Sequence, residues 1–398
     1  MKRQKKRQNG DNSDRLSNLP DHLLLHIMEF MPIKHSIQTC VLSKRWKDLW
    51  KSLTMLILHH LRDKKCVSHI LSGRDDSLPL HKLRYYHRIS KNKKGKNLHL
   101  DLETKLLEVM KYGASHNMKH LTVRVDPGLI KDLELPPSIF HCHSLTTLKL
   151  DFRHPVSHDY IKILFPKSLN LPALKSMYLA FLTFTTSENG CAEPFSACNM
   201  LNNLFIFCCC LQDDAKALCI SNSNVSLVVV GDTCDHTKGS YKKVVFCTPK
   251  LAFLSILGYP VFVAPSVCNL PFLEEGNIDH GYSDRPFKES LMIDWLHLLA
   301  GVKKMNISFR TFCELHTFQK KYPTNIIVPC FVRLKSLEVL WTSDSQIFDE
   351  IIIGKVKEMV TCLLQNSLRA KVDVILKAGS TPRKLEASVG ARFNAVDG

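Results

Sequence analysis

The sequence predicts two parts, a small three-helix unit at the N-terminus and a larger α/β solenoid in which short strands stack into a curved parallel sheet. The first observation is that residues 14–53 hold three short helical patterns with an excess of apolar side chains. The second is a short apolar pattern that recurs at intervals of 22 to 32 residues between 118 and 339. The length of 398 residues, 45% of them hydrophobic, leaves room for more than one folded unit.

The first predicted helix carries more apolar surface than a surface helix needs. Pro20 suits a first helical position because its missing N–H costs nothing there, and Asp14 or Ser17 can cap the first turn. Pro32 ends the helix, because a residue before proline is pushed out of the helical region. A surface helix requires one apolar stripe. This one has two adjacent faces, Leu23, Ile27 and Phe30 on one and Leu24, Met28 and Met31 on the other.

Two further short helices follow in the same unit. Ser36 can cap the second, and Ser43 can cap the third. The apolar residues of the third are spaced by three and four positions: Trp46, Leu49, Trp50 and Leu53. So short a unit is marginally stable unless it is cross-linked or docked, and no spaced cysteine set cross-links it. Its surplus apolar surface therefore packs either on another protein or, as a helical cap, on the next domain.

The unit closely resembles an F-box, especially the plant form that begins Asp-Arg-Leu-Ser-x-Leu-Pro-Asp and ends Val-Leu-Ser-Lys-Arg-Trp-x-x-Leu-Trp. Both motifs are present, at residues 14–21 and 41–50. The resemblance implies docking on the Skp-family adaptor of a cullin–RING ubiquitin ligase. It also implies the adaptor-binding residues, with Trp46 mainly a packing residue of the third helix: Leu19, Pro20, Leu23, Ile27, Pro32 and Trp46.

The net charge of +17 is concentrated near the N-terminus. Residues 1–100 hold 22 Lys and Arg against 8 Asp and Glu, and the other 298 residues hold 32 against 29. Residues 1–13 are expected to form a disordered tail whose basic cluster, between Lys2 and Arg7, is of the nuclear-localisation type. A second basic cluster lies between Lys91 and Lys96. Neither has the aromatic interleaving of a dedicated nucleic-acid module, so nucleic-acid binding is the weakest hypothesis.

Cysteine use and hydropathy indicate the compartment. The chain has fifteen cysteines, an odd number, and no apolar leader, which favours a reducing compartment. It has no run of eighteen apolar residues that could span a membrane. We therefore expect the protein in the nucleus or the cytoplasm. There is no Cys-x-x-Cys pair, and we expect neither a metal nor a cofactor.

The recurring pattern is an apolar residue, two others, an apolar residue, one other and a third apolar residue. In the weak copy at Leu273, Gly276 takes the middle place. The first residues of the nine copies are Met118, Leu145, Leu174, Leu201, Val225, Leu251, Leu273, Val302 and Leu334. The period and pattern are close to those of leucine-rich repeats, in which each unit is one strand plus a return segment. The copy at Leu201 matches most fully, with Cys209 at the buried position that takes Asn or Cys.

The domain boundaries follow from these patterns. We expect a linker or helical connector over 54–97, irregular repeats over 98–345 with a first strand at Leu98–Leu102, and a C-terminal cap over 346–376. The cap would hold a helix over 351–365 and a last strand over 371–376. Beyond it, 377–398 is predicted to be a disordered tail. The Thr248-Pro249 turn and the segment 362–373 resemble divergent leucine-rich repeats of plant F-box proteins.

No catalytic constellation is present in the sequence. His141 and His143 are interpreted as turn residues, and Cys208, Cys209 and Cys210 as packing residues at the end of a strand. Asp213 and Asp214 are interpreted as helix-capping residues at the start of a return segment. We therefore predict a protein that is not an enzyme.

The leading hypothesis is a substrate-recognition subunit of an SCF-type cullin–RING E3 ubiquitin ligase. The F-box would bind the Skp-family adaptor, and the repeats would bind the protein target, so that tethering replaces catalysis. The alternative is a leucine-rich-repeat scaffold or inhibitor without a ligase role, in which the first helices only cap the solenoid.

Overall fold

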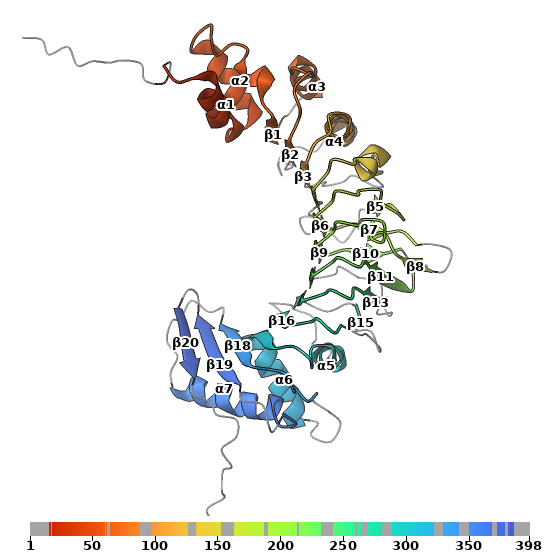
Figure 1. The fold of residues 1–398 in the computed structure, drawn as a ribbon, viewed down its shortest axis with the longest axis vertical. Helices are drawn as coiled ribbons and strands as arrows, with labels where there is room; N and C mark the ends of the chain where they lie inside the picture. Colours follow the sequence, from red (N-terminus) through yellow and green to blue (C-terminus); the bar gives the residue numbers. More distant parts are fainter. Residues whose placement is uncertain are drawn as a thin grey trace, which may run out of the picture.

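In this computed structural model the described residues are 16, 18–59, 61, 64–87, 97–125, 133–152, 163–186, 190–212, 215–231, 242–258, 262–263, 270–279, 289–321, 329–341, 350–367, 372–378 and 381–385. The chain follows an arc (Figure 1). A helical N-terminal unit lies at one end and a sheet backed by helices at the other. The predicted α/β class, with a helical unit followed by a large and mostly parallel sheet, is confirmed.

The N-terminal unit (residues 16–53) has two α-helices rather than three. They are α1 (Asp21–Glu29) and α2 (Ile33–Gln38), and the 3₁₀ helices η1 (Thr39–Val41) and η2 (Leu49–Ser52) follow. The predicted third helix is wrong as an α-helix. Residues 43–47 form tight turns in which Trp46 N–H donates to the Ser43 carbonyl, three residues back. This winding brings Trp46 and Trp50 into the same core, where both are buried.

The predicted caps are also wrong or lie outside the described residues. Pro20 and Pro32 occupy the positions before α1 and α2, and neither helix has a side-chain cap. Ser36 lies inside α2, where its buried hydroxyl donates to the Met28 carbonyl at 3.2 Å and so joins the two helices. Asp14 and Ser17 are not among the described residues.

One sheet of thirteen strands runs through the rest of the arc. Its strands in spatial order are β1 (Met55–His59), β2 (Lys82–His87), β3 (His120–Val125), β4 (Thr147–Asp151), β6 (Ser176–Ala180), β9 (Asn203–Phe207), β12 (Leu227–Gly231), β14 (Phe253–Leu257), β16 (Glu275–Asp279), β17 (Lys304–Ser308), β18 (Ser336–Trp341), β19 (Asp373–Ala378) and β20 (Thr381–Leu385). All neighbours pair in parallel except β19 and β20, which are antiparallel.

The nine predicted apolar patterns occupy nine consecutive strands, β3 to β18, in one register. Leu121, Leu148, Met177 and the equivalent residues pair across the sheet, and so do the third members of each pattern. These side chains are buried. At the start of each strand, one carbonyl of the preceding unit accepts two consecutive N–H groups, as when the Lys119 carbonyl accepts from Thr146 and Thr147. Each coil therefore repeats the hydrogen bonding of the previous one.

Two predictions about the start of the sheet are wrong. The expected connector over 54–97 contributes β1 and β2, with α3 (Lys64–Gly73) between them. The expected first strand at Leu98–Leu102 lies in α4 (Asn97–Ser115). The alternation there is local, whereas the longer spacing of buried Leu102, Leu106, Val109 and Met110 is helical.

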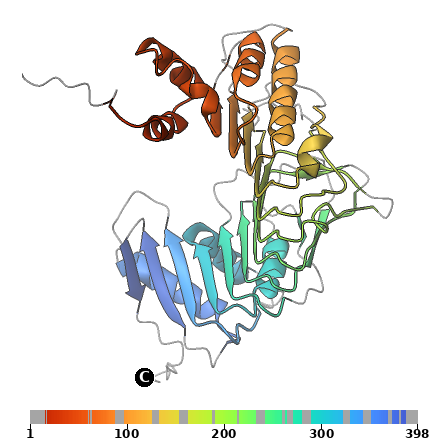
Figure 2. The same cartoon turned by 45° about the horizontal axis from the view of Figure 1, so that its top comes forward.

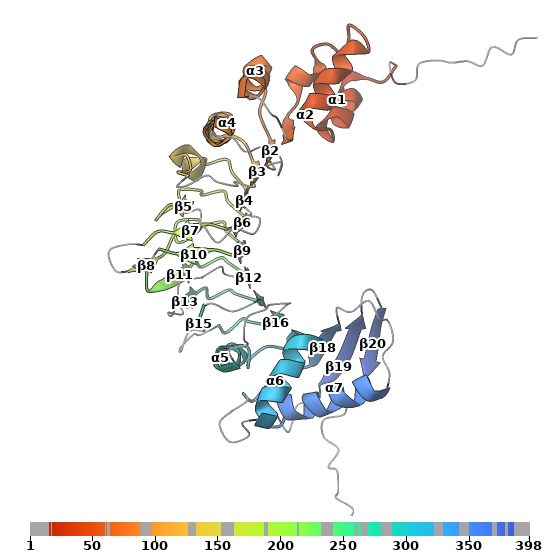
Figure 3. The same ribbon diagram turned by 180° about the vertical axis from the view of Figure 1, so that it is seen from behind.

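The outer side of the arc carries helices and two smaller parallel sheets (Figure 1 and, from behind, Figure 3). These sheets comprise β5 (Leu164–Phe165), β7 (Thr183–Phe184) and β10 (Cys210–Leu211), and β8 (Cys191–Ala192), β11 (Ala217–Ser221), β13 (Lys242–Cys247) and β15 (Phe262–Val263). Four rings stack edge-to-face between units from the 3₁₀ helix η3 (Pro137–His141) onward, with centroids 5.3 to 5.9 Å apart: Phe140, Phe165, Phe184 and Phe195. Their apolar area forms the core between the layers.

The C-terminal strands are covered by α5 (Glu289–Leu298), α6 (Phe309–Lys321) and α7 (Glu350–Leu363) (Figure 2). The structure thus contains a helix and a strand close to the bounds predicted for the cap. The tail prediction is wrong for Thr381–Leu385, which pair with β19. The remainder, 386–398, lies outside the described residues. Gly276, the glycine of the weak copy, faces Leu299, whose side chain fills the space of the missing one.

Candidate functional site

The N-terminal unit exposes an unusual share of the protein's large apolar side chains. Within the described ranges ten such side chains are exposed, and six of them belong to residues 16–42. On α1, Leu23 and Ile27 are each 40% exposed and Phe30 is 70% exposed. The other three are Leu16, Val41 and Leu42. Isolated apolar residues are ordinary on protein surfaces, but such a concentration on one small unit indicates a partner site.

The opposite side of the same unit is a well-packed core. Leu24 and Met28, the alternate face of α1, are fully buried. They pack in one core with Ile33, Trp46, Trp50 and Leu53. The helix therefore has both of the predicted apolar faces, and they differ in burial. One holds the unit together, and the other meets solvent.

Polar contacts fix the ends of α1. The Arg45 guanidinium donates to the Asp21 carboxylate at 2.7 Å through Nε, and it also donates to the Leu19 carbonyl. At the other end, the Thr54 hydroxyl donates to the Glu29 carboxylate at 2.7 Å. The Arg45–Asp21 pair lies at the surface, where such pairs typically contribute about 0–1 kcal/mol, so its role is to orient α1.

The six residues predicted to bind the adaptor do not share one environment. Pro20, Leu23 and Ile27 are exposed, and Leu19 and Pro32 are half-buried. Trp46 is only 2% exposed, so it belongs to the core and its role is packing.

The sequence prediction omitted four exposed apolar residues. They are Leu16, Phe30, Val41 and Leu42. Phe30 could have been found because it follows Leu23 and Ile27 on the same helical face. Val41 and Leu42 lie at the end of η1, beyond the reach of any single helical period.

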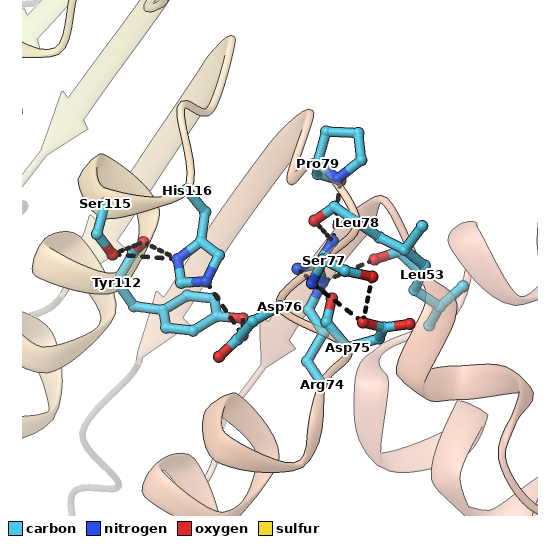
Figure 4. Close-up of polar contacts among 10 residues, drawn as sticks. All are labelled: Leu53, Arg74, Asp75, Asp76, Ser77, Leu78, Pro79, Tyr112, Ser115 and His116. Atoms are coloured by element: carbon cyan, nitrogen blue, oxygen red, sulfur yellow. Dashed lines mark hydrogen bonds and ion pairs between the residues drawn. The ribbon is translucent and has the colours of Figure 1, made fainter.

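The junction between the N-terminal unit and the sheet is built around a buried arginine (Figure 4). Arg74 follows α3 and is 4% exposed. Its guanidinium donates to the Leu53 carbonyl at 3.0 Å, and to the carbonyls of Leu78 and Pro79 at 2.9 Å each. Leu53 is the last residue of the N-terminal unit, so one side chain joins that unit to the loop that leads into β2.

A second set of contacts joins the same loop to α4 (Figure 4). The Asp76 carboxylate accepts a hydrogen bond from the Tyr112 hydroxyl at 3.0 Å and lies 3.1 Å from His116 Nε2. The Tyr112 and His116 rings stack with centroids 3.9 Å apart. Burial raises the pKa of the Tyr112 hydroxyl, which favours its role as a donor. The loop is therefore held from both sides.

The histidines and cysteines singled out in the sequence have structural partners. His141 Nδ1 lies 3.0 Å from the Pro137 carbonyl and His143 Nε2 lies 3.2 Å from Asn170, at the edge of an open hollow of about 610 Å³ beside α4. Cys208 forms the left-handed turn after β9 with φ 48°. Cys209 is buried, and its thiol is 3.6 Å from the Leu179 carbonyl. Asp213 and Asp214 lie outside the described residues.

The described part of the chain holds neither a metal-binding cluster nor a membrane-spanning helix. No group of three His, Cys, Asp or Glu side chains there is arranged to hold a metal ion. None of the helices described has the length and apolar character needed to cross a membrane.

Comparison with known proteins agrees with the position of this site. Residues 16–58 match the F-box domain. An F-box/FBD/LRR-repeat protein of Arabidopsis thaliana is 27% identical over 352 residues, which covers 82% of this chain and 71% of the relative. A second protein of that description is 28% identical over 353 residues, covering 84% and 68%. An FBD-associated F-box protein of the same plant is 26% identical over 411 residues, covering 94% and 93%.

The matched domain coincides with the unit that exposes apolar surface, so the chain is an F-box protein. These relatives, described as plant F-box/FBD/LRR-repeat and FBD-associated F-box proteins, are similar to the chain across most of their length and of its own. The F-box domain indicates binding to a Skp-type adaptor.

Proposed function

We propose that the protein is a substrate-recognition subunit of an SCF-type cullin–RING ubiquitin ligase. The F-box binds the Skp-family adaptor, and the stacked units bind the protein target. The observation that carries the proposal is the exposed apolar face of α1, formed by Leu23, Ile27 and Phe30 on a unit with its own packed core. Burying one such side chain fully contributes about 1.5–3 kcal/mol, so a partner that covers this face gains substantial affinity.

The sheet and its outer layer are interpreted as a divergent leucine-rich-repeat solenoid. Nine apolar patterns in one register support this interpretation, as does the outer layer of short parallel strands. Cys209 supports it further, because its buried thiol lies near the Leu179 and Phe207 carbonyls, as the Asn or Cys of a repeat would. The α-helices that begin and end the array replace the short strands of its middle.

In this role the protein acts by tethering rather than by acid–base chemistry. A target bound by the repeats reaches a high effective concentration near the ligase, and transfer to one of its lysines becomes nearly intramolecular. Such a mechanism requires a stiff connection between the two binding sites. The contacts of Arg74 with Leu53 and of Asp76 with α4 supply that connection.

Binding to a purified Skp-family adaptor tests the proposal. We expect a stable complex of the full chain with the adaptor, measured by co-purification and isothermal titration calorimetry. Leu19→Ala with Pro20→Ala, or Leu23→Ala with Ile27→Ala, should weaken it by about 2 kcal/mol or more, as hot-spot truncations do. The matched control is Met200→Ala, a side chain 53% exposed in the stacked units.

The same measurement separates the ligase subunit from a scaffold or inhibitor without a ligase role. A scaffold whose helices merely cap the array would not bind the adaptor, and its affinity for any other partner would not respond to the α1 variants. Unchanged adaptor affinity in both double variants would sink the proposal.

A further inference from the structure

The inner face of the thirteen-stranded sheet carries three kinds of side chain in sequence along the arc. Alternate residues of each strand are buried in the core, and the others lie on the inner face. In one register row, Arg84, Thr122, Lys149, Tyr178 and Phe205 are neighbours on successive strands. The face is thus basic over β2 to β4 and aromatic over β6 and β9.

The basic section lacks internal neutralisation. Lys82, Arg84 and Lys149 take part in none of the ion pairs found between described residues. Asp151, at the end of β4, already pairs with Arg124 of β3 at 2.9 Å. Partial burial lowers the pKa of Lys82, and the neighbouring Arg84 and Lys149 lower it further. Among the described residues, like charges that crowd together without carboxylate partners of their own indicate a place for an external anion.

The aromatic section is a group of three neighbouring rings next to that basic section. Tyr178 adjoins Lys149 in the register, and its ring centroid lies 5.2 Å from that of Phe207 and 6.3 Å from that of Phe205. Gly231 makes the arrangement possible, because a Cβ there would be 2.6 Å from the Phe207 ring. The three rings are half-buried by their own chain and keep surface for a partner.

The far section of the same face is acidic. Glu275, Asp279, Glu338 and Asp373 occupy inner-face positions of β16, β18 and β19. Lys304 lies between two of them, 3.2 Å from Glu275 and 3.4 Å from Glu338. Unlike the basic section, the acidic section is partly neutralised within the chain, because Lys304 pairs with Glu275 of β16 and Glu338 of β18.

We propose that the inner face from β2 to β9 binds an extended polypeptide segment of the target that carries acidic side chains beside a large apolar one. This rests on the proposed function, in which the repeats hold the target, and it adds the chemistry of the segment. Adjacent strands lie about 4.8 Å apart and an extended chain advances about 3.3 Å per residue. On this spacing, an aromatic anchor between Tyr178 and Phe205 lies about two residues from an acidic residue over Lys149 and about five residues from one over Arg84.

A nucleic acid is the other polyanion that basic and aromatic side chains could bind. The acidic section disfavours it, because a phosphate backbone that follows the arc past β14 would meet Glu275, Asp279 and Glu338. A polypeptide carries its charges only where its sequence places them. A short acidic segment that ends in an apolar anchor fits the first two sections and need not enter the third.

Selection from a displayed library of random twelve-residue peptides tests the proposal. The full chain serves as bait, with and without the Skp-family adaptor. The variant reverses the basic section, with Lys82→Glu, Arg84→Glu and Lys149→Glu. The matched control reverses three exposed lysines of the outer side, with Lys111→Glu, Lys167→Glu and Lys216→Glu, and so has the same net charge. Circular dichroism and thermal melting establish that both are folded, and Lys149→Glu alone, fully on the surface, repeats the test with one change.

The expected wild-type consensus has Asp or Glu about two to five residues from Phe, Tyr, Trp or Leu. The basic-section variant should lose it, and the control should keep it. The synthesised consensus peptide should bind the basic-section variant at least about tenfold more weakly by fluorescence polarisation, because like charges then face each other. Phe205→Ala should weaken it as well, with no change in salt dependence.

A selection without an acidic and apolar consensus, or one that yields the same peptides on the basic-section variant, overturns the proposal. A second outcome also overturns it. If a twenty-nucleotide single-stranded RNA binds the wild type but not the basic-section variant, and no peptide shows this difference, the face binds nucleic acid. Adaptor binding is measured separately on the same samples. A chain that fails to bind the adaptor yet selects acidic peptides contradicts the proposed function and not the binding chemistry of this face.

Discussion

The F-box and the stacked units differ in how much apolar surface they expose. In the F-box, α1 divides its apolar residues between a core face, with Leu24 and Met28 fully buried, and an outer face, with Leu23 and Ile27 40% exposed. In the stacked units, the repeated apolar positions are buried almost without exception, and the inner face shows charges and rings instead. A face that is apolar and exposed fits one permanent kind of partner, whereas a face with ordered charges discriminates among partners.

The largest loss of stability is expected in the core of the F-box, where apolar side chains are buried as they are in the stacked units. Trp46→Ala removes a side chain that is 2% exposed and should lower the free energy of unfolding of the F-box by about 3–5 kcal/mol. Adaptor binding would then be lost through unfolding, unlike in the Leu23 and Ile27 variants, whose melting temperature should be unchanged. Chemical denaturation followed by tryptophan fluorescence measures the difference. Trp46→Phe, which keeps most of the volume, should cost less, and equal losses in both variants would contradict the packing role.

The next effect concerns the boundary between the two regions. Arg74→Ala leaves the Leu53 carbonyl, in a buried hydrogen bond, and the partly buried carbonyls of Leu78 and Pro79 without this donor. It should cost about 3 kcal/mol, since removing a buried charged donor leaves its acceptors unsatisfied. Hydrogen exchange should rise over η2, β1 and the loop before β2, while β6 to β12 stay protected. Arg74→Lys keeps the charge without the planar fork and should restore only part of the loss. Uniform exchange changes along the whole sheet would show that Arg74 is not a local junction.

A smaller effect should appear in the weakest repeat. Gly276→Ala places a Cβ 2.8 Å from Leu299 and should destabilise the protein by about 1–3 kcal/mol through overpacking. Adding Leu299→Ala opens that space, so the double variant should be more stable than the sum of the single losses predicts. Gly301→Ala is the matched control, because nothing lies within 4 Å of its added Cβ. Strict additivity of Gly276→Ala and Leu299→Ala would mean that the two residues do not share this space.

The smallest effect is a pH dependence of the basic section of the inner face. Partial burial lowers the pKa of His120 from its ordinary 6.5, and Lys82, Lys119 and His81 lower it further. The folded chain thus resists protonation more than the unfolded chain. The His120 contribution to stability is complete above pH 6.5, declines as the pH falls through that value, and stops declining once folded His120 is protonated. Denaturation midpoints between pH 8 and pH 5 should decline less steeply in His120→Asn. An identical slope in both proteins would remove His120 as the cause.

Local periodicity predicted the middle of the fold well. The nine patterns from Met118 to Val339 gave the strands, their order and their register, because each strand buries every second residue against the same layer. The same rule would have found β1 and β2. Leu53, Leu56 and Leu58 form the pattern, and so do Leu80, Leu83 and Tyr85, all of them buried. The first of these patterns overlaps the end of the F-box motif at Leu53, which hides it.

Other features depend on contacts that no window of sequence contains. The predicted third helix of the F-box became turns because Trp46 and Trp50 must enter one core with Leu24 and Met28 from α1. Leu98–Leu102 alternates like a strand, and only its continuation to Met110 shows the helical spacing. The six adaptor residues were predicted from the F-box resemblance. The common exposure of Leu23 and Ile27 follows from their helical spacing, whereas the burial of Trp46 depends on the tertiary fold. The charges of the inner face became neighbours only through strand pairing between residues about thirty positions apart, as with Arg124 and Asp151.

The first strand of the sheet begins at Met55, two residues after the F-box core ends at Leu53. If the F-box holds the ligase, this short connection and the Arg74 contacts keep a bound target at a fixed distance and orientation from the ligase. A flexible linker would let a bound target sample many orientations. A rigid connection would present each bound target to the ligase in one orientation. The spacing between α1 and the inner face would then determine which target lysines receive ubiquitin. Inserting flexible residues after Leu53 would broaden the set of modified lysines and leave the affinities for the adaptor and for the target unchanged.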